Sequence, residues 1–168
     1  MFKIGDAVIH PAKGAGIIQS LQRMPGLSQK LRYYKIEVIG RRVKTTLMIP
    51  VKHAEELGLR PPIAKADLDQ VWEILAAPPQ TLPDDHKQRY KVLSEKLEKG
   101  DVLLSAEIVR DLVGRRKQAG KLNAPAEKIY SKALLLLTGE LAVSQDVKLQ
   151  TAKRQVSRWL NENLDTDI

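Results

Sequence analysis

The first sixty residues alternate apolar and polar positions with the two-residue period of β-strands. Four short runs are rich in β-branched and aromatic residues, and the turn-forming segments "PAKG", "RMPGLSQKLR" and "GRR" separate them. Strands this short and closely spaced predict a small, curled antiparallel sheet. The predicted strands are "DAVIH", "AGIIQSL", "YYKIEVI" and "VKTTLMIP".

Beyond Pro61 and Pro62 the apolar positions recur with the period of a helix. Two consecutive prolines neither continue a strand nor lie deep inside a helix, so they indicate a linker. The segment "LDQVWEILAA" places its apolar residues at i, i+3, i+4 and i+7. Asp67 is its predicted N-cap. Four more helices are predicted: one from near Asp84 to Gly100 with Tyr90, Leu93 and Leu97 facing inward, then "LLSAEIVRDLVGRRKQAG", a helix beginning at "NAPAEKIY", and "KLQTAKRQVSRWLNENL".

The change of period predicts two domains, a β module followed by a compact helical domain of about five helices. We expect the β module over residues 1–60, the linker over 61–66 and the helical domain over 67–168. A chain of 168 residues is long enough for two such small domains.

The chain contains no cysteine, which excludes disulfides and thiolate metal sites and fits a reducing compartment. Its longest apolar block, "KALLLLTGELAV", is broken by Gly139 and Glu140 and is too short to span a membrane. The N-terminal "MFKIGD" has no apolar signal core. These features predict a cytoplasmic protein without membrane contact.

The net charge of +8 is unevenly distributed. Residues 1–63 hold eleven Lys or Arg against four Asp or Glu, whereas residues 64–168 hold seventeen against sixteen. A basic excess is typical of contact with phosphates or with an acidic protein surface. A well-solvated basic face is the plainer alternative.

No constellation of residues points to catalysis. His10, His53 and His86 are far apart in sequence, and no pair has the spacing of metal ligands. The chain has no GxSxG motif, and its carboxylates cluster at predicted helix starts, where capping explains them. We therefore expect no enzymatic activity, no metal and no cofactor.

The glycine-containing segment "HPAKGAG" raises the question of a phosphate-binding loop. It lacks the GxxxxGK[ST] spacing, and a strand pattern, "IIQSLQ", follows it in place of a helix. Without a helix N-terminus there is no dipole to hold a phosphate. The glycines are better explained by a tight turn or a strongly bent strand, so the segment predicts a β-hairpin.

The opening "FKIGDAVIHPAKGAGII" resembles the start of the CarD/CdnL family of bacterial transcription regulators. The likeness spans nearly the whole chain, in order, through "YYKIEV", "LMIPVKHAEELGLR", "RYKVLSEKLEKGD", "AEIVRDL" and "KALLLLTGELA". The N-terminal module is also similar to the RNA polymerase-interacting domain of the transcription-repair coupling factor. Because this chain has no Walker A or helicase motifs, it is not that enzyme.

The resemblance implies a Tudor-like or SH3-like antiparallel β-barrel followed by a helical domain. It also implies that the barrel binds the β subunit of RNA polymerase through an exposed sheet edge. The helical domain would then contact promoter DNA at the upstream edge of the melted region and stabilise the open complex. A regulator of this kind acts by binding one state of the promoter complex better than another. It would be associated with the nucleoid through the polymerase.

Five residues match or lie beside the family's polymerase contacts. Met48 and Pro50 fall in "LMIP", Val38 matches an apolar contact on the neighbouring strand, and Arg23 and Met24 lie at or beside a contact in the first hairpin. Strand alternation predicts that the two residues flanking Met48 face one way and Met48 the other. A methionine on an exposed sheet face is an adaptable anchor, and a methionine in the barrel core is the structural alternative.

The resemblance also implies DNA contacts at His86, Arg89, Lys91 and Lys128. The family commonly has W-x-R-R-Y-K where this chain has "HKQRYK", so His86 stands at the position of a wedging tryptophan. Arg89, Lys91 and Lys128 would bind phosphates, which gives affinity without base recognition. Histidine offers a smaller apolar face than indole, so we expect a weaker wedge.

Other interpretations remain open at this level. Trp72 and Trp159 are predicted to pack in the core and not to replace the wedge. The alternative function is a KOW-type or SH3-like module that binds RNA or DNA directly, without polymerase. That module would bind nucleic acid alone with steep salt dependence, whereas the regulator would bind it weakly alone. We expect a monomer, with a domain-swapped dimer of the β module as the alternative.

Overall fold

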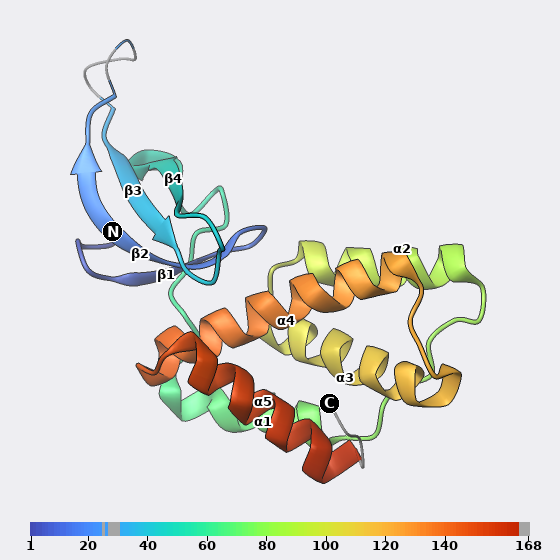
Figure 1. The fold of residues 1–168 in the computed structure, drawn as a ribbon. Helices are drawn as coiled ribbons and strands as arrows, with labels where there is room; N and C mark the ends of the chain where they lie inside the picture. Colours follow the sequence, from blue (N-terminus) through green and yellow to red (C-terminus); the bar gives the residue numbers. More distant parts are fainter. Residues whose placement is uncertain (25, 27–30, 165–168) are drawn as a thin grey trace. The chain divides into compact units, whose positions relative to one another are not determined.

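The computed structural model describes residues 1–24, 26 and 31–164 (Figure 1). The chain falls into two compact units, residues 1–62 and 63–168. The first contains the sheet and the second contains the α-helices. None of the described helices is long and apolar enough to cross a membrane.

The first unit is an antiparallel meander of four strands. These are β1 (Ala7–His10), β2 (Gly14–Gln22), β3 (Tyr33–Val38) and β4 (Thr45–Pro50), and their order in the sheet follows the chain. The predicted Tudor-like antiparallel sheet is confirmed. It is open within the described ranges, however, because β1 and β4 end the sheet and do not pair with each other. The first unit is therefore an open Tudor-like sheet over these residues and not the closed barrel that was expected.

One face of this sheet forms the core of the first unit. Tyr34 and Ile36 of β3 lie between Ile18 of β2 and Ile49 of β4, and all four side chains are buried. Leu47 packs against the same cluster from the edge strand. Alternate residues of a strand face opposite sides, so the even positions of β3 and the odd positions of β4 cover the core.

The opening segment is a hairpin, as predicted. β1 pairs with β2 in a register that sets His10 opposite Gly14, and Gly14 has a φ of 87°. Gly16 lies so close to β3 that a Cβ there would be 2.5 Å from Ile36 Cγ2 and 2.9 Å from the carbonyl oxygen of Glu37. The first glycine supplies the turn, and the second allows the strands to approach.

The second unit contains the five predicted helices. They are α1 (Leu68–Ala76), α2 (His86–Glu98), α3 (Val102–Ala119), α4 (Ala124–Gln145) and α5 (Leu149–Leu164). Two short 3₁₀ helices complete the chain, Val51–His53 in the first unit and Lys65–Asp67 before α1.

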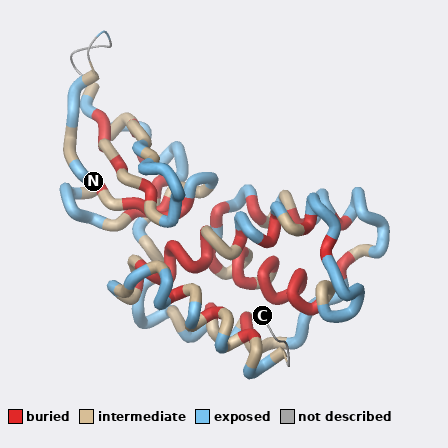
Figure 2. Tube along the Cα trace, in the orientation of Figure 1, coloured by how far each residue is buried: buried red, intermediate tan, exposed pale blue. Residues whose placement is uncertain are grey.

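Helices α3 and α4 form the centre of this unit, and buried positions follow both along their length (Figure 2). Helix α2 packs on both of them, while α1 contacts α3 and α5. Trp72 of α1 and Trp159 of α5 lie 5.3 Å apart between ring centroids, and Trp159 Nε1 donates to the carbonyl of Trp72 at 2.9 Å. The two indoles therefore join α1 to α5.

Side-chain caps fix where α2, α3 and α4 begin. Asp85 accepts from two backbone N–H groups of α2, Asp101 does the same for α3, and Asn123 accepts from Ala126 N–H in α4. Asp67 occupies the N-cap position of α1, but its side chain makes no capping bond. The preceding 3₁₀ turn leads directly into that helix.

The loop between α1 and α2 is held against α3. Pro79 packs on Gly114 so closely that a Cβ on the glycine would lie 2.4 Å from Pro79 Cβ. Nearby, the carboxylate of Asp111 accepts from Gln80 N–H at 2.9 Å and from Arg110 Nε at 2.8 Å. These contacts set the position from which α2 starts.

The backbone on each side of Pro61 and Pro62 is hydrogen-bonded within its own unit. Ile9 and Arg60 exchange two backbone hydrogen bonds at 2.8 and 3.1 Å. In the second unit, Ile63 N–H donates to the buried carboxylate of Glu140 at 2.8 Å, and Ser144 Oγ donates to the Ile63 carbonyl at 2.7 Å. Arg60 also donates from its guanidinium to the Pro61 carbonyl at 3.1 Å.

Candidate functional site

The sheet face opposite the core carries Met48. This residue pairs with Lys35 across β3 and β4, and its side chain is half-buried. The residues on either side of Met48, by contrast, pack toward the core. We call this surface the outer sheet face and define it by Lys35, Glu37, Thr46 and Met48, whose positions alternate with the core residues. Lys44 and Glu37 form an ion pair at its margin, with 3.0 Å between Nζ and Oε2.

The other residues of the expected polymerase contact are not equally accessible. Pro50 is half-buried at the end of β4, opposite Tyr33. Val38 is 5 % exposed and shares the core side of β3 with Ile36, so the structure does not place it on the outer sheet face. Arg23 is exposed and Met24 is half-buried, both just after the end of β2.

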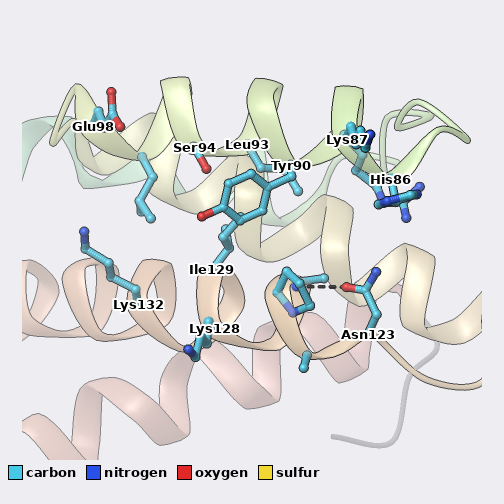
Figure 3. A pocket seen from close by; sticks show the side chains of 15 residues that line it. His86, Lys87, Tyr90, Leu93, Ser94, Glu98, Asn123, Lys128, Ile129 and Lys132 are labelled. Atoms are coloured by element: carbon cyan, nitrogen blue, oxygen red, sulfur yellow. Dashed lines mark hydrogen bonds between the residues drawn. The ribbon is translucent and has the colours of Figure 1, made fainter.

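A groove of about 690 Å³ lies in the second unit between α2 and α4 (Figure 3). Its apolar wall comes from both helices and includes Leu93, Leu97 and Ile129. Tyr90 projects into the space between the helices, above Ile129. The side chain of Tyr90 is 52 % exposed. The sequence interpretation that turned Tyr90 inward is therefore wrong.

Cations dominate the rim of this α2–α4 groove. Lys87 stands at the start of α2 beside His86, while Lys128 and Lys132 project from successive turns of α4, and all four residues are exposed. Glu98 is the acidic residue in the lining. Across the described chain, no ion pair involves these three lysines. The groove therefore presents unneutralised positive charge around an aromatic ring.

Arg89 also lines the groove, but it contributes little to this exposed charge. Its side chain is 7 % exposed, and Nη1 donates to the carbonyls of Pro83 at 2.7 Å and Asp84 at 2.9 Å. Through Nη1 the guanidinium thus holds the loop before α2, and the residue is largely covered. These contacts give Arg89 a structural role, which differs from the phosphate contact predicted for it.

The remaining DNA-facing predictions divide between the groove and its surroundings. His86 and Lys128 line the groove, as described, whereas Lys91 lies outside its lining. Lys91 is exposed, with Nζ 3.9 Å from Glu95 Oε1. Sequence reasoning missed Lys87 and Lys132. The four-residue spacing of Lys128 and Lys132 puts them on one helix face and could have revealed the second of these.

The three histidines lie in separate environments. His10 Nδ1 accepts from Ala12 N–H at 3.1 Å, and burial lowers the pKa of His10 below its ordinary 6.5, with Lys13 adding to the effect. His53 lies 2.8 Å from the Glu56 carboxylate. Among the residues that the structure describes, no group of three or more His, Cys, Asp or Glu side chains could hold a metal ion.

The two units match two protein-family models. Residues 2–63 match the model described as the CarD-like/TRCF RID domain, and residues 70–157 match CarD, C-terminal domain. The chain belongs to the CarD family. A CarD-family relative from Bacillus subtilis (strain 168), which bears the name "Putative transcription factor YdeB", is 33% identical over 147 residues. The match covers 88% of this chain and 94% of YdeB.

Membership of the CarD family makes this chain a transcription regulator, a class defined by binding and not by catalysis. Its RID domain is an RNA polymerase-interacting module, and that module coincides with the sheet unit. The CarD C-terminal domain covers most of the helical unit, including the whole α2–α4 groove.

Proposed function

We propose that this CarD-family protein binds the β subunit of RNA polymerase through its outer sheet face and stabilises the open promoter complex. The helical unit then contacts DNA at the upstream edge of the melted region. The observation that carries the proposal is the position of Met48. It is an apolar, flexible side chain on the sheet face opposite the core, on a strand that ends the sheet.

An edge strand with an accessible methionine suits recognition of another protein. Because β4 pairs with β3 alone within the sheet, its other edge presents backbone donors and acceptors to which a partner strand can add. Met48 then supplies an anchor that adapts its shape to the partner, and Pro50 limits the conformations of the strand end. Lys35 beside Met48 favours an acidic partner surface.

The exposed lysines of the α2–α4 groove support the DNA contact. Each phosphate neutralised by a lysine releases counterions, so the affinity depends strongly on salt and little on base sequence. Three such lysines give only weak binding alone. Polymerase binding by the sheet unit would raise the effective concentration of the helical unit beside promoter DNA. No chemical step is needed, because preferential binding to the open state prolongs its lifetime.

The polymerase contact is tested by capture of the chain on a β-lobe fragment. We expect Met48→Ala and Pro50→Ala to weaken binding about 5- to 30-fold, the range of an interface anchor. Val43→Ala is the matched control because Val43 is also apolar and is 76 % exposed, but lies beyond the outer sheet face between β3 and β4. Unchanged capture of both variants would rule out this face as the polymerase contact.

The DNA contact predicts an effect at His86. Indole offers a larger apolar face to a distorted minor groove than imidazole does. His86→Trp should therefore lengthen the lifetime of open promoter complexes formed with this protein, measured by challenge with a competitor after complex formation. If the lifetime stays the same or shortens, His86 does not act as a wedge. That result would not affect the proposed binding to polymerase.

A further inference from the structure

The α2–α4 groove contains an exposed aromatic ring that the expected wedge does not use. Tyr90 follows His86 by one helical turn and is 52 % exposed, while its neighbours Leu93, Leu97 and Ile129 are 1 %, 7 % and 5 % exposed. On the α2 side of the groove, the accessible apolar surface is therefore concentrated in one flat ring, while the small residues Ala124 and Pro125 are exposed at the start of α4. The aliphatic wall beneath it is already covered by packing within the unit.

The charges around Tyr90 select an anionic occupant. Lys87 approaches from the start of α2, and Lys128 and Lys132 lie on the facing helix (Figure 3). In the described part of the chain none of these ammonium groups takes part in an ion pair. Cations that flank an exposed aromatic ring are the arrangement by which proteins bind single-stranded nucleic acid, with a base on the ring and phosphates on the cations.

We propose that the α2–α4 groove receives an unpaired base of a single DNA strand, which stacks on Tyr90. Lys128 and Lys132 bind the adjoining phosphates. This inference rests on the proposed function, in which the helical unit reaches the edge of melted DNA, and it identifies the strand state that the groove binds. The volume of about 690 Å³ lies within the range of roughly 300–1,000 Å³ typical of ligand pockets.

The same surface fits an acidic peptide less well. An amphipathic helix gains its affinity by burying apolar side chains in a hydrophobic groove. Here the leucine and isoleucine side chains of the wall are almost fully covered, so beyond Tyr90 a peptide would find exposed apolar area mainly at two small residues, Ala124 and Pro125. A base needs only the exposed face of Tyr90, which the groove supplies.

The test uses the full chain, without polymerase, and a fluorescein-labelled single strand of about twelve nucleotides, within the range bound by known modules. Binding is followed by anisotropy at low ionic strength, beside a duplex of the same sequence. We expect Tyr90→Ala to weaken single-strand binding roughly 5- to 150-fold, as loss of one stacked base does. Tyr90→Phe, which keeps the ring, should bind within about twofold of the unchanged chain.

Three further measurements make the result specific. Duplex affinity should be nearly the same for Tyr90→Ala and Tyr90→Phe, since phosphate contacts do not need the ring. A 2-aminopurine base in the strand should lose fluorescence on binding the unchanged chain and Tyr90→Phe, but not Tyr90→Ala, because stacking quenches it. Unfolding of each variant, followed by tryptophan fluorescence, verifies that the helical unit is intact.

The proposal is overturned if the single strand does not bind at the highest soluble protein concentration. Equal loss of single-strand and duplex binding in Tyr90→Ala also overturns it, as does an acidic peptide that displaces the labelled strand and binds Tyr90→Ala normally. These outcomes leave the proposed function standing, since capture by the β-lobe fragment tests that separately. Failed capture together with intact stacking would reject the polymerase contact alone.

Discussion

Arg89 provides a sharp test of the structure, because sequence resemblance and geometry assign it different roles. As a phosphate contact, it would contribute to DNA affinity and little to folding. In the structure, its Nη1 instead donates to the carbonyls of Pro83 and Asp84 at 2.7 and 2.9 Å, and the side chain is 7 % exposed. Arg89→Ala removes both hydrogen bonds and the packed aliphatic part of the side chain.

The size of the effect follows from these two contacts. A hydrogen bond from a charged donor contributes about 1.5–3 kcal/mol, and part of that is recovered because the freed carbonyls can bind water. We therefore expect Arg89→Ala to lower the free energy of unfolding of the helical unit by about 2–4 kcal/mol. For a unit of this size, that corresponds to a decrease in Tm of roughly 8–20 °C.

Tryptophan fluorescence isolates the relevant unit, since both tryptophans of the chain lie in α1 and α5. The matched control is Lys128→Ala, which also removes one cation from the helical unit but at an exposed position. Lys128→Ala should leave the unfolding free energy within about 0.5 kcal/mol of the original. It should reduce the slope of log affinity for duplex DNA against log salt by about 0.9.

The opposite pattern would refute this assignment. If Arg89→Ala unfolds at the original temperature and reduces the salt slope by about 0.9, its guanidinium contacts phosphate and the buried geometry is wrong. Arg89→Lys gives a second comparison, because lysine keeps the charge but cannot reproduce the planar guanidinium donor geometry. We expect Arg89→Lys, like Arg89→Ala, to leave the salt slope unchanged and to recover the lost stability only in part.

Three further substitutions test other parts of the fold. Gly114→Ala should lower the unfolding free energy of the helical unit by about 1–3 kcal/mol, because the added Cβ would lie 2.4 Å from Pro79 Cβ. Unchanged urea unfolding would show that the loop moves aside without an energetic cost. Trp159→Phe keeps an aromatic ring but loses the hydrogen bond to the Trp72 carbonyl, so thermal unfolding should show a stability lower by about 1 kcal/mol. Unchanged stability would contradict a stabilising role for that hydrogen bond. The lowered pKa of His10 means that the unfolded chain binds a proton more readily, so the sheet unit should lose stability as pH falls below 6.5. His10→Asn should flatten that part of the pH dependence in urea unfolding followed by NMR, and an identical pH profile would exclude His10 as its source.

Local periodicity was sufficient to predict most of the architecture. The alternation of "TTLMIP" correctly separated Met48 from the core-facing positions around it, and Gly14 and Gly16 correctly indicated a hairpin. The same alternation could have excluded Val38 from the outer sheet face, since it has the parity of the core residue Ile36. Val38 was predicted as a contact because the family resemblance was given more weight than the strand pattern.

Contacts between α2 and the loop that precedes it determined which residues of the helix are buried, which the helical period left open. Arg89 and Tyr90 precede Leu93 by four and three residues, so the helical period admits either of them to the buried stripe. The carbonyls of the preceding loop require a donor, and only the arginine satisfies them. Because Arg89 takes the buried position, Tyr90 is left exposed in the α2–α4 groove. The hydrophobic pattern of α2 alone does not predict this exposure.

The two prolines of the short connection lower the entropic cost of folding the chain. Arg60 and Ile63 are each tied by their backbone to a folded unit, so Pro61 and Pro62 are the only residues between two fixed ends. Proline restricts its own φ and the ψ of the residue before it, which removes most of the torsional freedom that a linker ordinarily has. Ordering these two prolines on folding therefore costs less backbone entropy than ordering two ordinary linker residues would.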